Sequence, residues 1–119
     1  MKSANAIRDK SFTFALRVVK LNRFLTREKQ EYVLSKQLLR SGTAIGAMVR
    51  EAEHAESKAD FIHKLSIALK EANETDYWIE LLHQSDTITS QQHASLLPDI
   101  TELIKLLISI IKTSKHNRS

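Results

Sequence analysis

Apolar residues recur along the chain with the spacing of amphipathic helices, and four such stretches can be separated. They run from Ala4 to about Thr26, from about Glu28 to Ala55, from Ser57 to Gln84, and from about Thr89 to Ser114. In each stretch the apolar side chains return every three or four residues, so they share one face of an α-helix. The pattern predicts an all-α, antiparallel up-down four-helix bundle in a single domain over residues 1–119.

Each stretch carries an inward face of residues that we expect in the core. The first contributes Ile7, Ser11, Phe14, Val18, Leu21 and Leu25; the second Leu34, Leu38, Ser41, Ile45, Met48 and Ala52; and the third Phe61, Leu65, Ala68, Ala72, Ile79 and Leu82. The fourth has a wide apolar arc that runs from Leu106 through Leu103, Leu107, Ile100 and Ile111 to Ile108. Gly42 and Gly46 lie within the second stretch, and their spacing predicts a smooth strip where another backbone approaches closely.

Two areas are apolar beyond what one bundle can bury. The first helix has a second apolar patch about 140° from its inward face, and the arc of the fourth helix spans roughly 200°. Trp78 lies where the third helix turns away from its inward face, and we expect it to be an exposed anchor. We therefore expect homo-oligomerisation through these positions. The predicted interface residues are Phe12, Leu16, Val19, Trp78 and Leu106.

Local signals mark the helix ends. Ser57 followed by Asp60, and Thr89 followed by Gln92, resemble capping boxes, in which side chains satisfy free backbone N–H groups. Pro98 either kinks the fourth helix or marks its true first turn.

Composition narrows the class of protein. The chain has no cysteine, only 2 glycines and 1 proline, so disulfides and thiolate metal sites are excluded and long helices are favoured. No signal peptide is recognisable, and the most apolar segment, 103–111, is about half a membrane span. We expect a cytoplasmic protein that does not contact membranes.

Charge is divided unevenly along the chain. Residues 1–50 carry 11 Lys/Arg and 3 Asp/Glu, residues 51–102 carry 3 and 11, and residues 103–119 carry 4 and none. Seven cations on the outward arcs of the first two helices form the predicted nucleic-acid-binding surface: Arg17, Lys20, Arg23, Arg27, Lys36, Arg40 and Arg50. The alternative is a solvated face, or pairing of these cations with the acidic third helix.

Catalytic and metal sites are not expected. Glu51 with His54 and Glu80 with His83 repeat the Glu-x-x-His spacing of di-iron bundles. Both pairs end consecutive helices, so in an antiparallel bundle they lie about 35–40 Å apart and cannot share a metal. We interpret them as surface pairs, and Asp76 near His83 as part of a structural hydrogen bond. We expect no enzyme, cofactor, metal or small-molecule substrate.

Two segments resemble a known family. Residues 39–47 (LRSGTAIGA) and 57–72 (SKADFIHKLSIALKEA), followed by Glu74-Thr75 and Tyr77-Trp78, resemble the bacterial four-helix-bundle family of the 23S ribosomal RNA intervening-sequence protein. The resemblance covers nearly the whole chain. It implies up-down bundles, which in some members assemble as rings of five. The family it indicates also includes the accessory protein of diversity-generating retroelements, whose basic surface binds nucleic acid and a reverse transcriptase.

Within the resemblance, five residues match the family's motifs: Arg40, Ser41, Glu71, Glu74 and Trp78. The chain departs from the family at Met48, where asparagine is usual, and at Ala44, where serine is common. The leading hypothesis is a non-enzymatic oligomer, with rings of five as the implied form, that binds structured RNA or DNA through its basic faces. The alternative is a protein–protein adaptor or assembly scaffold.

Overall fold

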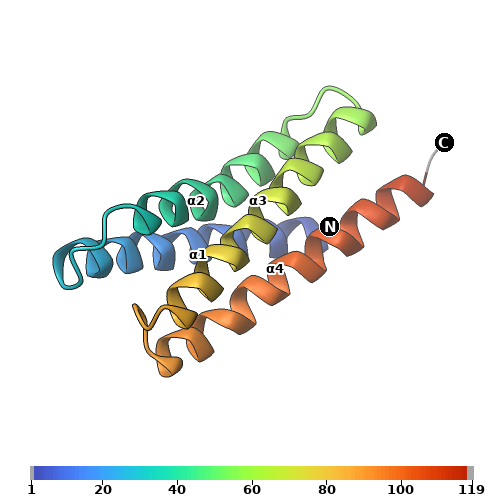
Figure 1. Cartoon of the computed structure of the whole chain (residues 1–119). Helices are drawn as coiled ribbons and strands as arrows, with labels where there is room; N and C mark the ends of the chain where they lie inside the picture. The colour runs from blue at the N-terminus through green and yellow to red at the C-terminus, as the bar shows by residue number, and fades with distance from the viewer. Residues whose placement is uncertain (1, 118–119) are drawn as a thin grey trace.

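Four helices make up the described part of the chain, residues 2–117 of a computed structural model (Figure 1). They are α1 (Lys2–Arg27), α2 (Leu34–Glu53), α3 (Lys58–Gln84) and α4 (Ser90–His116). No strand occurs among these residues, so the predicted all-helical class with four helices is confirmed. The α1–α2 and α3–α4 turns lie at one end of the molecule, and the α2–α3 turn lies at the other (Figure 1).

The start of α2 differs from the prediction. The helix begins at Leu34 rather than near Glu28, because residues 28–33 form a turn in which Gln30 has a positive φ of 54°. The Glu31 carboxylate accepts hydrogen bonds from the backbone N–H groups of Leu34 at 3.0 Å and Ser35 at 2.7 Å. This side chain thus satisfies free donors at the start of α2, and it makes a tight reversal possible without glycine.

The predicted caps of the two later helices are confirmed. The Ser57 hydroxyl accepts from the Asp60 N–H at 3.0 Å, and Thr89 with Gln92 forms a complete capping box. Because α4 begins at Ser90, Pro98 lies inside the helix rather than in its first turn.

The core is formed largely by the predicted inward faces. Val18, Leu25, Leu38 and Ile45 are fully buried, as are their counterparts on the later helices: Ala68, Ala72, Ile79, Leu82, Ile100 and Leu107. Four predicted core residues are only half-buried against this cluster, namely Leu21, Leu34, Met48 and Phe61. Val49 and Thr75 are buried although they were not predicted to be.

α1 and α2 approach closely at the glycine strip. A Cβ atom at Gly42 would lie 2.8 Å from the Val18 methyl groups, so only glycine fits there without movement. A Cβ atom at Gly46 would lie 3.4 Å from the Ser11 carbonyl oxygen, which is ordinary contact. The predicted close approach is therefore present, and Gly42 is the position that requires it.

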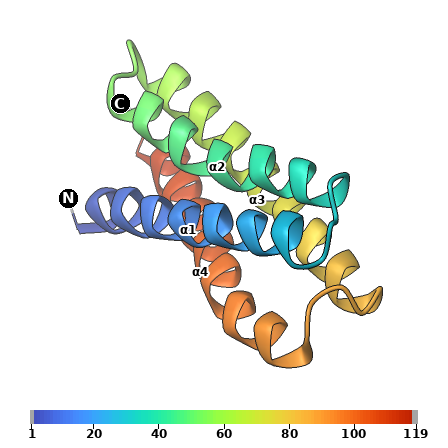
Figure 2. The ribbon, with the colours of Figure 1, turned by 90° about the vertical axis from the view of Figure 1, so that its left-hand side faces the viewer.

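α1 crosses α4 at an angle (Figure 2). Ion pairs join the two helices over the N-terminal half of α4, where Arg17 lies 2.7 Å from Asp99 and Lys10 lies 3.2 Å from Glu102. Farther along α4, Ile108 is 44% exposed, so part of the wide apolar arc stays at the surface. Among the described helices, none is long and apolar enough to cross a membrane.

Candidate nucleic-acid interface

Two of the seven predicted binding cations are engaged in ion pairs. Arg17 fastens α1 to α4: its guanidinium donates to Asp99 at 2.7 Å, to the Ser95 carbonyl at 3.0 Å and to the Ser95 hydroxyl at 2.7 Å. A side chain with this many partners is not freely available to phosphate. Arg17 is thus paired, as in the alternative interpretation, but with α4 and not with the third helix that this alternative named.

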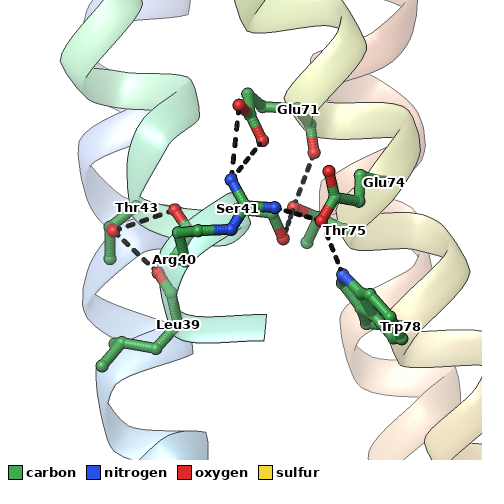
Figure 3. A network of polar contacts seen from close by, with 8 residues as sticks. All are labelled: Leu39, Arg40, Ser41, Thr43, Glu71, Glu74, Thr75 and Trp78. Carbon is green, nitrogen blue, oxygen red and sulfur yellow. Dashed lines mark hydrogen bonds and ion pairs between the residues drawn. The ribbon is translucent and has the colours of Figure 1, made fainter. Parts of the chain in front are cut away.

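Arg40 is the second engaged cation, and it joins α2 to α3 (Figure 3). Its guanidinium donates to Glu71 at 3.2 Å and also pairs with Glu74. The hydrogen bond to Glu74 raises the pKa of Arg40 above its usual value, and the indole of Trp78 and then Arg40 lower the pKa of Glu74. The charge of Arg40 is therefore balanced by Glu71 and Glu74 within the bundle.

The polar network continues into the core beside Arg40. The hydroxyls of Ser41 and Thr75 lie 2.9 Å apart and share a hydrogen bond, and both residues are buried (Figure 3). Of the residues that match the family motifs, Arg40, Ser41, Glu71, Glu74 and Trp78 all belong to this one α2–α3 network. Glu71 and Glu74 thus face the arginine of the neighbouring helix and pair with it.

Trp78 does not have the predicted exposure. It is half-buried against the core, and its indole N–H donates to Glu74 at 3.0 Å. Its neighbour Tyr77, packed edge-to-face with a ring-centroid distance of 5.1 Å, is the aromatic residue that faces solvent, at 59% exposed. The expected exposure of Trp78 is therefore wrong, while its part in subunit contact stays a prediction.

The other predicted interface residues fall into two groups. Phe12 is 56% exposed and Leu16 is 49% exposed, whereas Val19 and Leu106 are half-buried. Phe12 also lines a shallow groove between α1 and α2, whose remaining walls are Arg8, Ser11, Ala15, Thr43, Gly46, Ala47 and Arg50. Apolar surface thus gathers on α1 beside a groove with an arginine at either side.

Five of the seven cations remain unpaired. Within residues 2–117 the exposed side chains of Lys20, Arg23, Arg27, Lys36 and Arg50 form no ion pair. Four of the five, all but Arg50, lie in the last turns of α1 or the first turn of α2, around the turn of residues 28–33. Lys20 also lines a groove between α1 and α4 with Phe24, Gln91 and Gln92.

The two Glu-x-x-His pairs lie at opposite ends of the molecule, as expected. Glu51 pairs with Lys64 at 3.2 Å, and His54 is exposed. His83, by contrast, is half-buried, and within the described residues it forms no hydrogen bond to Asp76; its Nε2 lies 3.2 Å from the Ser90 hydroxyl. The interpretations of His83 as a surface residue and as a partner of Asp76 are both corrected.

Comparison with known proteins identifies relatives. Residues 4–109 match the family described as 23S rRNA-intervening sequence protein. A solved structure from Bacteroides thetaiotaomicron VPI-5482, a protein of unknown function from the S23 ribosomal protein family, is 60% identical with a TM-score of 0.91. That match covers 92% of this chain and 98% of the other. No curated protein matches the chain.

Proposed function

This chain belongs to the 23S rRNA-intervening sequence protein family, and we propose that it is a non-enzymatic, homo-oligomeric bundle that binds structured RNA. The binding surface is the end of the molecule around the α1–α2 turn. The cations that contact phosphate are Lys20, Arg23, Arg27 and Lys36, with Arg50 farther along α2. Arg17 and Arg40 hold helices together instead.

One observation carries this proposal: these cations are exposed and unpaired in the described residues, while Arg17 and Arg40 are paired with carboxylates of α4 and α3. Lys20, Arg23 and Arg27 are spaced by three and four residues, so they share one face of α1. A row of cations on one helical face matches the spacing of charge along a nucleic-acid backbone better than scattered cations do.

The same turn presents an aromatic ring beside the cations, which favours folded RNA over a plain duplex. Tyr32 is 62% exposed and lies in the sequence between Arg27 and Lys36. Unpaired bases in RNA loops stack on exposed aromatic rings, whereas bases within a duplex are not accessible in this way.

The assembly proposed here is an antiparallel up-down bundle that forms a ring, with five subunits as the expected number. The pairings of Ser41 with Thr75 and of Glu51 with Lys64 support the antiparallel order, because residue numbers fall along α3 as they rise along α2. Phe12 and Leu16, exposed on α1 ahead of the cations, support subunit contact. Burial of this apolar patch leaves the basic end of α1 at the edge of the interface.

A protein–protein adaptor is the second candidate function. Tyr77 favours it, since this large aromatic side chain is 59% exposed on the helix that carries more acidic residues than any other described helix. Exposed tyrosines are common anchors at protein interfaces. In this alternative the basic end serves assembly rather than RNA.

Fluorescence anisotropy with a labelled RNA hairpin tests the proposal. If all five cations contact phosphate, affinity falls by roughly 100- to 500-fold between about 50 and 200 mM salt. Reversal of three cations, Lys20→Glu, Arg23→Glu and Arg27→Glu, is expected to weaken binding at least about 100-fold and to flatten the salt dependence. Tyr32→Ala should weaken binding to the hairpin but not to a blunt RNA duplex.

The matched control reverses three exposed cations elsewhere, Lys70→Glu, Lys105→Glu and Lys112→Glu, which changes the net charge equally. If both triple variants lose RNA affinity equally, the loss comes from net charge alone, and the assignment of the site is overturned. Absence of binding by the wild-type protein at about 50 mM salt would remove the RNA function. If the α1 variant instead dissociates the oligomer, the adaptor gains support.

A further inference from the structure

Three potential metal ligands converge where α3 ends and α4 begins. Glu80 and His83 lie in the last turns of α3, and His93 lies in the first turn of α4. One ligand atom from each of the three side chains lies within 4.8 Å of the others. The two imidazole rings stack with centroids 4.0 Å apart and 11° between their planes, and His93 Nε2 lies 2.9 Å from the Glu80 carboxylate.

His83 is incompletely satisfied within this cluster. Its Nδ1 is buried and has no hydrogen-bond partner among the described residues. Its Nε2 has only the Ser90 hydroxyl, at 3.2 Å, and a hydroxyl serves equally as donor or acceptor. Neither ring nitrogen is therefore held by a strong partner. A buried ring nitrogen without a partner is unusual and calls for an explanation.

The surroundings favour a positive charge. His93 is largely enclosed, with its side chain 14% exposed, so this ligand of the site is shielded from solvent. Asp76, one turn before Glu80, has its pKa raised first by burial and then by the negative charge of Glu80. The negative charge of Glu80 thus disfavours the charged form of Asp76, and a nearby cation would offset that repulsion.

We propose that Glu80, His83 and His93 bind a divalent transition metal of the zinc class, with water as the fourth ligand. Two imidazole nitrogens and one carboxylate oxygen form a ligand set that suits Zn²⁺ and Co²⁺, whereas Mg²⁺ and Ca²⁺ prefer oxygen ligands throughout. A tetrahedral zinc ion places its ligand atoms about 3.4 Å apart, so ligand atoms within 4.8 Å of one another need to approach by at most about 1.4 Å.

The bound ion would tie α3 to α4 across their connecting turn. The ion would replace the hydrogen bond between His93 and Glu80, and it would bind a ring nitrogen of His83. The Glu-x-x-His motif alone does not reveal this site, because its third ligand comes from the following helix and not from Glu51 and His54.

Titration calorimetry with ZnCl₂ on the untagged, metal-stripped protein tests the proposal directly. One ion is expected per chain, and saturating zinc should raise the thermal unfolding midpoint by about 5 °C or more. Cobalt should give the intense visible absorption bands of a tetrahedral site. His83→Gln, His93→Gln and Glu80→Gln should each weaken zinc binding at least about tenfold, since loss of even an outer partner costs that much.

The matched control is His54→Gln, which alters the same motif on α2 and should leave zinc affinity unchanged. Circular dichroism in the absence of metal shows whether each variant is folded, and the wild-type titration decides the question if one is not. The proposal is overturned if the wild-type protein binds no zinc, if cobalt gives only the weak bands of an octahedral ion, or if His54→Gln weakens binding as much as His83→Gln.

Discussion

The two sides of α2 hold their neighbours by different means. Toward α3, Arg40 and Ser41 form ion pairs and a buried hydrogen bond with Glu71, Glu74 and Thr75. Toward α1, the strip around Gly42 packs directly against Val18, whose methyl groups would lie 2.8 Å from a Cβ atom at Gly42. The segment 39–47 thus supplies both contacts from successive residues.

This difference explains which cations are free. The only carboxylates of α2 are Glu51 and Glu53, at its C-terminal end, so α2 offers the cations at the other end of α1 no partner. Cations are paired where they meet carboxylates of α3 or α4, as Arg17 meets Asp99. They stay unpaired on the outward face of α1. In the described residues α1 and α2 are joined without an ion pair, which leaves the cations of α1 available for a ligand.

The largest effect is expected on the α1 side of α2, at Gly42. Gly42→Val places methyl groups where Val18 already lies, and overpacking of this kind should lower the free energy of unfolding by about 2–3 kcal/mol. Gly46→Ala is the matched control, because its Cβ meets only ordinary contact and alanine favours helices by about 1 kcal/mol. Urea denaturation measures both, and equal destabilisation would contradict the comparison.

On the α3 side, Arg40→Ala should lower the free energy of unfolding by about 1–2 kcal/mol, since it leaves Glu71 and Glu74 close together without their cation. Arg23→Ala, which removes an unpaired cation, should change it by less than about 0.5 kcal/mol. The same denaturation experiment compares the two. A larger loss at Arg23 would mean that the outward face of α1 is structural.

Low pH should reduce the difference in stability between the wild-type protein and Arg40→Ala. The pKa of Glu74 is lowered in the folded protein, so its contribution to stability is present above its unfolded pKa of 4.5 and is lost as the pH falls through the lower, folded value. The gap in unfolding midpoint between wild type and Arg40→Ala should therefore narrow as the pH is taken from 7 to about 3. A gap that stays constant would show that Arg40 acts through packing rather than charge.

Within the α2–α3 network, the smallest effect is expected at the indole of Trp78. Trp78→Phe keeps the ring packing and removes the N–H that donates to Glu74, for a loss of about 0.5–1 kcal/mol. When the change is made in the Arg40→Ala protein, the two losses should not add, since both residues act on the same carboxylate. Strict additivity would argue against a connected network.

The helices could be predicted because their signals are local. The inward faces follow from helical periodicity, and Ser57 and Thr89 cap through hydrogen bonds that span three residues. The start of α2 was missed because residues 29–31 have good helix propensity. Only the left-handed conformation of Gln30 and the long reach of Glu31 produce the turn.

The nucleic-acid interface could be predicted only in part, because whether a cation is paired depends on residues that are far away in the sequence. The sequence identifies seven outward cations but not that Arg17 meets Asp99, 82 positions away. The half-burial of Trp78 was missed for the same reason, because this residue packs against a core to which all four helices contribute. The juxtaposition of His83 and His93 depends on the length of the turn between α3 and α4.

The division of charge also gives the molecule a permanent electric dipole. Residues 1–50 carry a surplus of 8 positive charges and residues 51–102 a surplus of 8 negative charges, on opposite halves of the helix order. Such particles attract one another head to tail in dilute buffer, and added electrolyte weakens that attraction once the screening length falls to about 10 Å, near 0.1 M. Its solubility should therefore rise with salt, the reverse of what a uniformly charged protein shows.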